Sequence, residues 1–353
     1  MKLCRMHLNI LVTGGAGYIG SHTAVALVEA GFRVVLLDNF SNSDFSAVQR
    51  LRSLVNQEVP FYEADCRNKS DLIHVFNSEK EQGCPITGVI HFAALKAVGE
   101  SVEKPELYKL NNVGGTERLL EVMEGFGVQS LVFSSSCTVY GEAENIPVDE
   151  SSPFLPSESP YGFTKQACEK SIVQHAEKNI GFSSTLLRYF NPIGAHPSSV
   201  IGESPRGVPN NLVPFLCQAV AKLRDPLTVF GTDYPTHDGS CIRDYLHVMD
   251  LAEAHVKAIL YLLQAGNSMG CRAFNLGTGH GVSVLEVIET FEKVTGMKVP
   301  HQFGKRREGD VVAIWANAER AKQELKWETT RPLGQGLLDS WNWQQKLGEE
   351  FDL

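Results

Sequence analysis

The chain reads Thr13-Gly14-Gly15-Ala16-Gly17-Tyr18-Ile19-Gly20 between its first apolar run and its first amphipathic stretch. The run before this loop, residues 9–12, is continuous, as expected of a strand that is covered on both faces in a parallel sheet. The stretch after it, residues 18–30, predicts a helix. Glycines between a strand and a helix permit a tight turn and let the backbone approach a phosphate, which the helix N-terminus attracts. The loop therefore predicts a dinucleotide site.

The glycines of this loop fit two spacings of the dinucleotide fingerprint. They match GxGxxG at residues 15, 17 and 20, and equally GxxGxxG at residues 14, 17 and 20. The loop also precedes Asp38, which ends a second apolar run at 34–37. An acid at this place hydrogen-bonds the ribose 2′-hydroxyl and repels a 2′-phosphate. The pattern favours NAD over NADP; a structural turn with a solvated aspartate is the alternative.

Further apolar runs extend the same rhythm along the chain. Runs at 88–92 and 130–133 alternate with helical stretches, among them 106–125. Strand–helix–strand alternation predicts an α/β fold, a Rossmann-type doubly wound parallel sheet. From about residue 191 prolines and glycines interrupt the rhythm, and one helix with an apolar stripe follows at 284–294. We expect an NAD-binding domain over 1–190 and a smaller mixed α/β substrate domain over 191–353, with part of 232–262 packing back on the first.

Composition and charge exclude several classes of protein. The 353 residues are 43% hydrophobic, and the net charge of −9 gives no basic surface for a nucleic-acid backbone. No apolar stretch is long enough to span a bilayer, and the N-terminal segment is too short in apolar residues for a secretion signal. The eight cysteines are scattered without a CxxC pair, which favours reduced thiols, no metal site and a cytoplasmic location.

A tyrosine and a lysine lie four residues apart in Tyr161-Gly162-Phe163-Thr164-Lys165, and hence on one face of a helix. A lysine ammonium favours the phenolate and lowers the tyrosine pKa, so the pair is a candidate general base for a hydroxyl proton. Ser136 follows the apolar run at 130–133, at the strand end where an α/β sheet presents its ligand crevice. Taken alone, the pair would be an exposed helical pair, but here it accompanies a dinucleotide loop.

Together these three features resemble the extended short-chain dehydrogenase/reductase superfamily, with its TGxxGxxG loop, a Ser/Thr and YxxxK. Longer segments are similar to the UDP-glucose 4-epimerase family within it. They are His91-Phe92-Ala93-Ala94-Leu95-Lys96, Asn111-Asn112, Arg188-Tyr189-Phe190-Asn191, Pro209-Asn210-Asn211-Leu212, Arg243-Asp244-Tyr245-Leu246-His247-Val248 and Arg307-Glu308-Gly309-Asp310. The resemblance runs over essentially the whole chain.

The resemblance implies an isomerase that keeps NAD bound and interconverts UDP-galactose and UDP-glucose. Tyr161 would remove the sugar 4-hydroxyl proton while hydride leaves C4, Lys165 would lower the tyrosine pKa, and Ser136 would hydrogen-bond O4. The 4-keto sugar would then turn and take the hydride back on its other face. The cofactor would be held by Gly14, Gly17, Tyr18, Ile19, Gly20, Asp38, Asn39, Asp65, Cys66, Phe92, Lys96, Asn111, Tyr161, Lys165 and Phe190. The UDP-sugar would be held by Ser136, Asn191, Asn211, Leu212, Arg243, Arg307, Asp310 and Ile314.

Two residues depart from the family pattern. Cys137 stands where many epimerases have alanine; it is either an acid/base group, as in related epimerase/reductases, or a small buried thiol, and the second interpretation is favoured. Ile314 stands where a large aromatic side chain blocks an N-acetyl group at sugar C2. Since isoleucine is smaller than tyrosine, we expect some turnover of UDP-N-acetylgalactosamine as well.

Two other functions compete with epimerisation. A 4,6-dehydratase places an Asp-Glu pair after the active-site Ser/Thr, but this chain has Cys137 and Thr138 there and lacks the general acid. A non-catalytic NAD sensor on the same fold is the second alternative, against which Ser136, Tyr161 and Lys165 all argue. The resemblance also implies a homodimer that pairs through the helices near 106–126 and 161–179.

Overall fold

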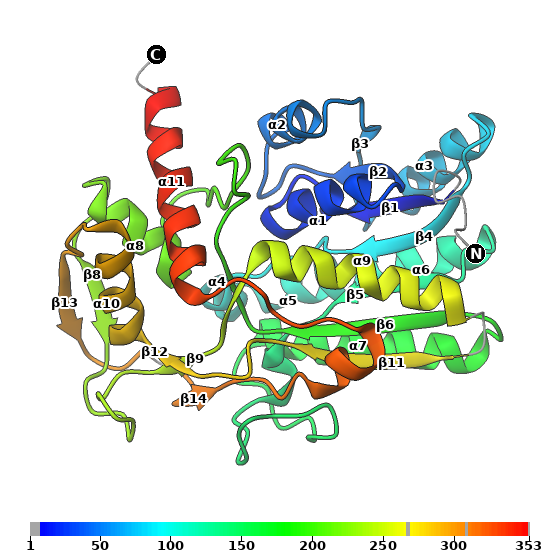
Figure 1. The fold of residues 1–353 in the computed structure, drawn as a ribbon. Coiled ribbons are helices and arrows are strands. Elements are labelled where there is room, and N and C mark those ends of the chain that lie inside the picture. The colour runs from blue at the N-terminus through cyan, green and yellow to red at the C-terminus, as the bar shows by residue number, and fades with distance from the viewer. Residues whose placement is uncertain (1–7, 266–268, 308–309, 352–353) are drawn as a thin grey trace.

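The computed structural model of the protein describes residues 8–265, 269–307 and 310–351. Its largest element is a seven-stranded sheet in the order β3-β2-β1-β4-β5-β6-β11, with every neighbouring pair parallel (Figure 1). The strands are β1 (Asn9–Thr13), β2 (Arg33–Asp38), β3 (Phe61–Glu63), β4 (Ile86–His91), β5 (Ser130–Ser134), β6 (Ser183–Tyr189) and β11 (Cys271–Leu276). The order runs outward in both directions from β1, which confirms the predicted doubly wound sheet.

Helices cover both faces of this sheet. On one face, α1 (Tyr18–Glu29), α2 (Phe45–Val55) and α9 (Val248–Ala265) share a hydrophobic cluster with Ile10 and Val12 of β1. On the other, α3 (Lys69–Glu81), α6 (Gly115–Gly125) and α7 (Pro160–Lys178) pack in the cluster that contains Leu11. Successive side chains of β1 thus enter opposite cores, which is why the strand is apolar throughout.

The helical stretch expected over 106–125 is present, but it is not one regular helix. It runs through α5 (Pro105–Tyr108), the π-helical η2 (Lys109–Gly114) and α6, and it is preceded by α4 (Val98–Glu103). The π-helical turn contains Asn111 and Asn112. Asn112 bonds the backbone of Leu95 and the hydroxyl of Thr164, so this turn joins the loop after β4 to α7. Such turns are frequent at functional sites.

The rest of the chain builds small mixed sheets and three helices around a third hydrophobic cluster. In α10 the apolar stripe predicted at 284–294 is confirmed, because Val287, Ile288 and Phe291 are buried. The helices are α8 (Leu212–Val220), α10 (Val284–Thr295) and α11 (Leu333–Phe351), with short turns η3 (Cys137–Tyr140) and η4 (Ala321–Leu325). The strands are β7 (Asn191–Ile193), β8 (Leu227–Phe230), β9 (Ile242–Arg243), β10 (Tyr245–His247), β12 (Val282–Ser283), β13 (His301–Gly304) and β14 (Ala313–Ile314).

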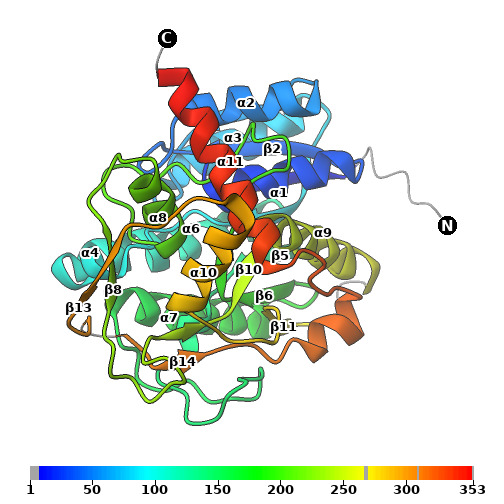
Figure 2. The same cartoon turned by 60° about the vertical axis from the view of Figure 1, so that its left-hand side comes forward.

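Two elements from beyond residue 190 return to the main sheet. Helix α9 packs against α1, and β11 pairs with β6 as the edge strand. Helix α11 crosses the other way: Figures 1 and 2 show it running from beside α8 and α10 towards α2. Its Trp343 ring lies 5.2 Å from the Arg50 guanidinium of α2. The two halves therefore interlock.

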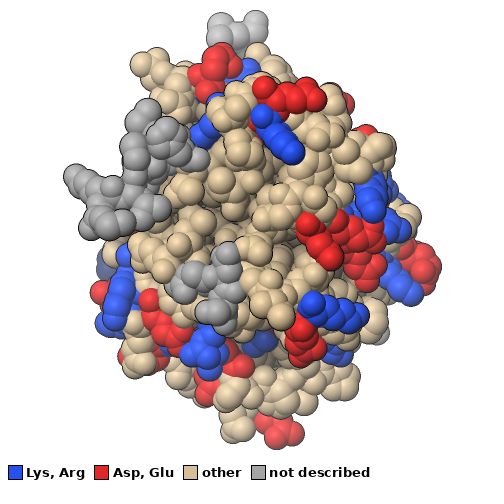
Figure 3. Space-filling model, turned by 90° about the vertical axis from the view of Figure 1, so that its right-hand side faces the viewer, with Lys and Arg blue, Asp and Glu red and all other residues tan. Residues whose placement is uncertain are grey.

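Within the described part of the chain, no helix combines the length and apolarity that crossing a membrane requires. Figure 3 shows acidic and basic side chains interspersed around the rim of one face, with uncharged residues at its centre. Since phosphate-backbone binding needs a field of positive charge, this face does not provide one.

Three buried histidines predict a fold that is sensitive to acid. Burial lowers the pKa of His22 and His91 to about 3 and that of His255 to about 4. Below about pH 6.5 the unfolded chain protonates these imidazoles and the folded chain does not, so their stability contribution is present above pH 6.5 and is lost as pH falls. We expect the unfolding free energy in urea titrations to fall by up to about 4 kcal/mol per pH unit between about pH 5.5 and 4.

A pair of variants tests this acid sensitivity. His255→Gln should reduce the slope by about one proton, or about 1.4 kcal/mol per pH unit. His74→Gln removes an exposed histidine of α3 and should leave the slope as it is. Equal slopes for His255→Gln and the wild type would contradict the prediction.

Candidate active site

A cavity of about 410 Å³ opens at the carboxyl ends of the central strands. It lies where the strand order reverses between β1 and β4, the place at which open α/β sheets bind their ligands. Residues from both halves of the chain line it, including the glycine loop, the loop after β4, the ends of β5 and β6, and residues 201–205. Its size is within the range of small-molecule and cofactor sites.

The glycine loop forms a backbone cradle at one end of this cavity. Gly14 has φ +68°, and a Cβ there would lie 2.8 Å from the backbone nitrogen of Ala93, so the turn needs glycine. At Gly20 a Cβ would lie 2.2 Å from the Gly14 carbonyl oxygen, so α1 can pack on the loop only without a side chain. Gly17 caps α1 without a side-chain hydrogen bond. The first turn of α1 therefore keeps backbone N–H donors for an anion, and these residues fit a dinucleotide pyrophosphate.

Acidic and amide side chains gather beyond the cradle, at the end of β2. The buried Asp38 carboxylate accepts hydrogen bonds from the Ala16 N–H (3.1 Å) and the Ser43 hydroxyl (2.8 Å). Asn39 donates to Asp65 (3.0 Å). Hydrogen bonds from Arg67 lower the pKa of Asp65 to about 2, although burial opposes this shift. Both carboxylates line the cavity, where an anionic acceptor fits ribose hydroxyls.

Tyr161 and Lys165 lie on the cavity-facing side of α7, one turn apart. Ser159 caps this helix and Pro160 occupies its first turn, so the chain begins helical structure just before Tyr161. The Lys165 Nζ lies 5.9 Å from the centre of the Tyr161 ring and donates a hydrogen bond to the Ser134 carbonyl (2.7 Å). Because Ser134 is the last residue of β5, this bond holds the ammonium at the carboxyl end of that strand.

Burial dominates the protonation of this pair. It lowers the pKa of Lys165 to about 8, against the influence of Cys168 and Glu169. It raises the pKa of the Tyr161 hydroxyl above its usual value, with Tyr189 acting in the same direction and a hydrogen bond with Ser136 acting in the other. The sequence had suggested a lowered tyrosine pKa. The cost of desolvating the phenolate exceeds the stabilisation that Lys165 was expected to give it. Tyr161 therefore needs further positive charge nearby to act as a base.

A buried polar network lies directly behind these side chains. Arg188 of β6 forms a two-point contact with Glu169 of α7, with Nη2 to Oε2 at 2.7 Å and Nε to Oε1 at 2.9 Å. The Ser135 hydroxyl also donates to Glu169 (2.5 Å). The network ties β5, β6 and α7 together next to Ser136 and Lys165, which fixes their relative positions. Sequence analysis did not single out Glu169, although it lies four residues after Lys165 on the same helical face.

The structure brings most of the predicted site residues to one cavity. All fifteen residues expected to hold the cofactor line it. Of the eight expected to hold the substrate, four also line it: Ser136, Asn191, Asn211 and Leu212. The other four, Arg243, Arg307, Asp310 and Ile314, form a separate group beside the cavity-lining Tyr245. Glu308 and Gly309, between Arg307 and Asp310 in the motif, lie outside the described residues.

The two arginines of this group are both next to the carboxylate of Asp310. Asp310 accepts a hydrogen bond from Arg307 (2.7 Å) and lies 3.7 Å from the Arg243 Nη2. Ile314 of β14 pairs with Arg243 of β9, and its side chain is 5% exposed. The prediction that Ile314 faces the sugar remains a prediction, since its side chain is packed in the core and does not line the cavity.

The environment of Cys137 does not favour an acid/base role. It lines the cavity directly after Ser136, and burial raises the pKa of its thiol to about 11, although Arg243 acts in the opposite direction. Such a thiol stays protonated near neutral pH and is a poor base. Among the described residues, the carboxylates that line the cavity are Asp38, Asp44, Asp65 and Glu203. None of them belongs to the Ser136–Tyr161–Lys165 group.

Comparison with known proteins agrees with this arrangement. The family described as GDP-mannose 4,6 dehydratase matches residues 11–339. A UDP-glucose 4-epimerase of Bacillus subtilis is 50% identical over 95% of this chain and 96% of its own length. The chain belongs to the UDP-glucose 4-epimerase family. The dehydratase description covers the wider group, and the absence of a carboxylate after Ser136 separates this chain from dehydratases.

Solved structures of this family share the whole fold. The UDP-glucose 4-epimerase of Stenotrophomonas maltophila, with bound NAD and formylated UDP-arabinopyranose, has a TM-score of 0.92 at 43% identity, covering 98% of this chain and 100% of that one. The enzyme of Bifidobacterium longum, in complex with NAD+ and UDP, has a TM-score of 0.90 at 40% identity, covering 96% and 98%. The predicted fold and family are therefore confirmed.

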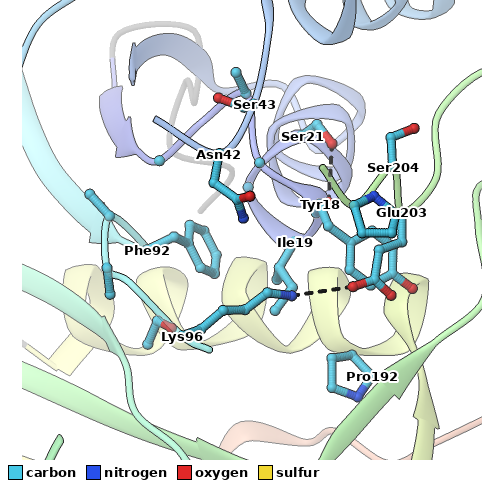
Figure 4. A pocket seen from close by; sticks show the side chains of 18 of the residues that line it. Tyr18, Ile19, Ser21, Asn42, Ser43, Phe92, Lys96, Pro192, Glu203 and Ser204 are labelled. Carbon is cyan, nitrogen blue, oxygen red and sulfur yellow. Dashed lines mark hydrogen bonds and ion pairs between the residues drawn. The ribbon is translucent and has the colours of Figure 1, made fainter. Parts of the chain in front are cut away.

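Some cavity residues could not be anticipated from sequence. Trp343 reaches the cavity from α11, and Glu203 from the loop between β7 and α8. Neither belongs to a motif that points to a ligand. Figure 4 shows Glu203 beside Tyr18, with Lys96 reaching towards it. These contacts join segments more than a hundred residues apart, so only the tertiary structure identifies them.

Proposed function

We propose that this protein interconverts UDP-galactose and UDP-glucose with NAD bound in the cavity. One observation carries the proposal: the glycine cradle, Ser136, Tyr161 and Lys165 line the same cavity. A dinucleotide held by the cradle and extended along the strand ends would reach the Tyr161–Lys165 pair. The close relatives bear the name of this activity.

The residues of this chain would act on the sugar 4-hydroxyl. Bound NAD, held by the cradle, Asp38 and Lys165, would supply a reversible hydride acceptor for sugar C4 and a positive nicotinamidium charge that would favour the phenolate form of a nearby tyrosine. Tyr161 would remove the hydroxyl proton and later give it back. Lys165 would supply positive charge from its fixed position on the Ser134 carbonyl. Ser136 would hydrogen-bond the sugar oxygen and help to pass the proton.

The nucleotide half of the substrate would be held by residues other than Ser136, Tyr161 and Lys165. Arg243 and Arg307 are the candidate ligands of the diphosphate, because guanidinium groups bind phosphate oxygens in pairs. Asp310 holds both arginines and would bind the uridine ribose. Asn191, Asn211 and Leu212 would line the remainder of the substrate path. Anchoring by the nucleotide leaves the sugar ring free to turn between the two hydride transfers.

Incubation of the purified protein with UDP-galactose and no added NAD tests the function directly. Proton NMR should show UDP-glucose formed without net oxidation or reduction. A 4-keto-6-deoxy product would replace the proposal with a 4,6-dehydratase. Bound NAD with no turnover of any sugar nucleotide would favour a non-catalytic sensor.

Substrate range is the finer part of this proposal. We expect turnover of UDP-N-acetylgalactosamine, because the family resemblance assigns position 314 to the side of sugar C2, and the isoleucine, packed here in the core, occupies less volume than a tyrosine would. In Ile314→Tyr, kcat/KM for the acetylated substrate should fall at least about tenfold relative to UDP-galactose, since one steric group in a pocket is worth about 1–3 kcal/mol. Ile314→Val is the control that keeps the site small and apolar. Equal discrimination in wild type and Ile314→Tyr would refute the gate.

A homodimer is the second finer proposal. Val98, Val102, Leu110 and Phe163 expose 46%, 63%, 61% and 54% of their surface, and they lie on neighbouring helical segments α4, η2 and α7. Adjacent exposed apolar side chains of this kind mark interaction surfaces. Phe163→Glu should convert the dimer to a monomer in light scattering after gel filtration. Ile180→Glu changes a fully exposed residue just beyond α7 and should leave the dimer intact. A monomeric wild type would contradict the proposal.

The division at residue 190 and the cytoplasmic location also remain proposals. The first is supported by the separate hydrophobic cluster around α8, α10 and α11. The second is supported by the free thiols of all seven cysteines within the described residues.

A further inference from the structure

A loop of the C-terminal half crosses the mouth of the cavity. Residues 194–211, here called the strap, connect β7 to α8. The strap folds back on itself through a bridge between Ala195 and Gly202. Its members Ile201, Gly202, Glu203, Ser204, Pro205 and Asn211 line the cavity. In Figure 4 Glu203 and Ser204 face Asn42 and Ser43 across the space, with Lys96 below.

Glu203 makes three of the hydrogen bonds that hold the strap in place. One oxygen of its carboxylate, Oε1, accepts from the Lys96 Nζ (3.2 Å) and from the Asn211 Nδ2 (2.8 Å). Its backbone carbonyl accepts from the Trp343 indole N–H (2.9 Å). The Glu203 side chain is 11% exposed, so this ion pair is shielded from solvent on the carboxylate side. Lys96 belongs to the loop after β4, and the contact therefore closes across the cavity.

Two further contacts fasten the strap to the NAD-binding half. Arg206 donates to the backbone carbonyls of Phe40 (2.9 Å) and Ser43, in the loop that follows Asp38. The Tyr18 hydroxyl, on the first turn of α1, donates to the Gly194 carbonyl (2.6 Å). The strap is thus anchored at the cradle, at the ribose end and at Lys96, which together span the dinucleotide site.

We propose that the strap retains the cofactor, and that the Glu203–Lys96 pair is its latch. The inference rests on the proposed function, because it concerns the NAD that the function requires. A dinucleotide lying between the cradle and Tyr161 passes beneath the strap and leaves only when these contacts break. Glu203 is a positioning residue in this scheme: it touches Lys96 and Asn211 and acts through them.

Considered by charge alone, Glu203 should weaken the binding of NAD and not retain it. The Glu203 carboxylate lies in the same cavity as a site for a diphosphate, so simple Coulomb repulsion would weaken binding. Neutralising Glu203 should then slow the release of NAD. If the strap is a latch, neutralising Glu203 should speed it. The sign of the change therefore separates the two explanations.

The test compares cofactor exchange in the holoenzyme. The wild type, Glu203→Gln and Arg206→Ala are loaded with NAD, and the exchange of bound NAD for isotopically labelled NAD is followed after rapid gel filtration. We expect exchange about tenfold faster in Glu203→Gln, because a neutral amide oxygen accepts the bonds from Lys96 and Asn211 more weakly than a carboxylate does. Arg206→Ala, which changes an exposed side chain distant from Lys96, should also exchange faster. Glu328→Gln breaks an exposed ion pair with Lys322 and is the matched control.

The outcomes separate the strap from the proposed function. Faster exchange in both strap variants, with the thermal midpoint of unfolding unchanged, supports the latch. Exchange that is unchanged or slower in Glu203→Gln overturns it. Loss of labelled and unlabelled NAD alike from the wild type would instead overturn the proposed function, because no cofactor would then be retained.

Discussion

Tyr161→Phe should lower kcat by about a thousandfold, the range of a lost general acid–base group, while the protein still holds NAD. The substitution removes one oxygen atom from a half-buried ring and should leave the packing of α7 unchanged. The hydroxyl lines the cavity together with Ser136, and Lys165 lies one helical turn away. Without it the sugar 4-hydroxyl proton has no acceptor within the group.

The experiment separates chemistry from folding by a matched variant. Tyr261→Phe also removes a phenolic hydroxyl, one that donates to Glu324 (2.8 Å) and does not line the cavity. Turnover of UDP-galactose and bound NAD are measured in both variants. Tyr261→Phe should keep both. Full turnover in Tyr161→Phe would remove Tyr161 from the mechanism, whereas loss of NAD from Tyr161→Phe would assign it to cofactor binding.

Lys165→Met should lower kcat by at least about a hundredfold, because the phenolate loses its fixed cation. The same change should cost little stability. In the folded protein burial holds the pKa of Lys165 at about 8, while in the unfolded chain it is near 10.4. Between these values the unfolded chain binds more protons. The buried ammonium therefore destabilises the fold below about pH 8, and this penalty diminishes as pH rises from 8 towards 10.4.

Replacing the ammonium removes the penalty but leaves the Ser134 carbonyl without its donor. The two effects are each about 1–3 kcal/mol and oppose one another, so the unfolding free energy at pH 7 should change by less than about 2 kcal/mol. Urea denaturation measures this change alongside turnover. Lys170→Met, an exposed position on the same helix, should alter neither activity nor stability. A large loss of stability in Lys165→Met would make its loss of activity uninformative about charge and would refute the predicted balance.

Local sequence was sufficient to predict four of the seven strands, β1, β2, β4 and β5, and to select the candidate catalytic residues. The runs that form β1, β2, β4 and β5 are continuous and apolar because both faces of these strands are covered, and such runs are visible without an alignment. The glycine loop and the YxxxK pair each place their residues by spacing alone. Gly14, Gly17 and Gly20 of the loop line one cavity together with Tyr161 and Lys165.

Strands β6 and β11 were missed for a physical reason. β6 begins Ser183-Ser184-Thr185, and all three hydroxyl-bearing side chains are buried, so the strand has no apolar run at its start. Backbone pairing with β5 and β11 satisfies the peptide groups of the strand, whereas the hydroxyls of Ser184 and Thr185 are buried without a hydrogen-bond partner. β11 alternates in burial at its start and lies beyond the apparent domain boundary. A rule based on apolar runs finds neither.

The sequence by itself determined the fold class, the glycine cradle and the spacing of the Tyr161–Lys165 pair, because each depends on residues close together in the chain. Only the tertiary structure decided what surrounds them. It placed Arg188 against Glu169 behind the catalytic group, Glu203 against Lys96 across the cavity mouth, and Trp343 at its rim. It also changed the expected tyrosine pKa, because desolvation depends on packing from every side. Charge and burial are properties of the assembled site, and spacing along the chain does not specify them.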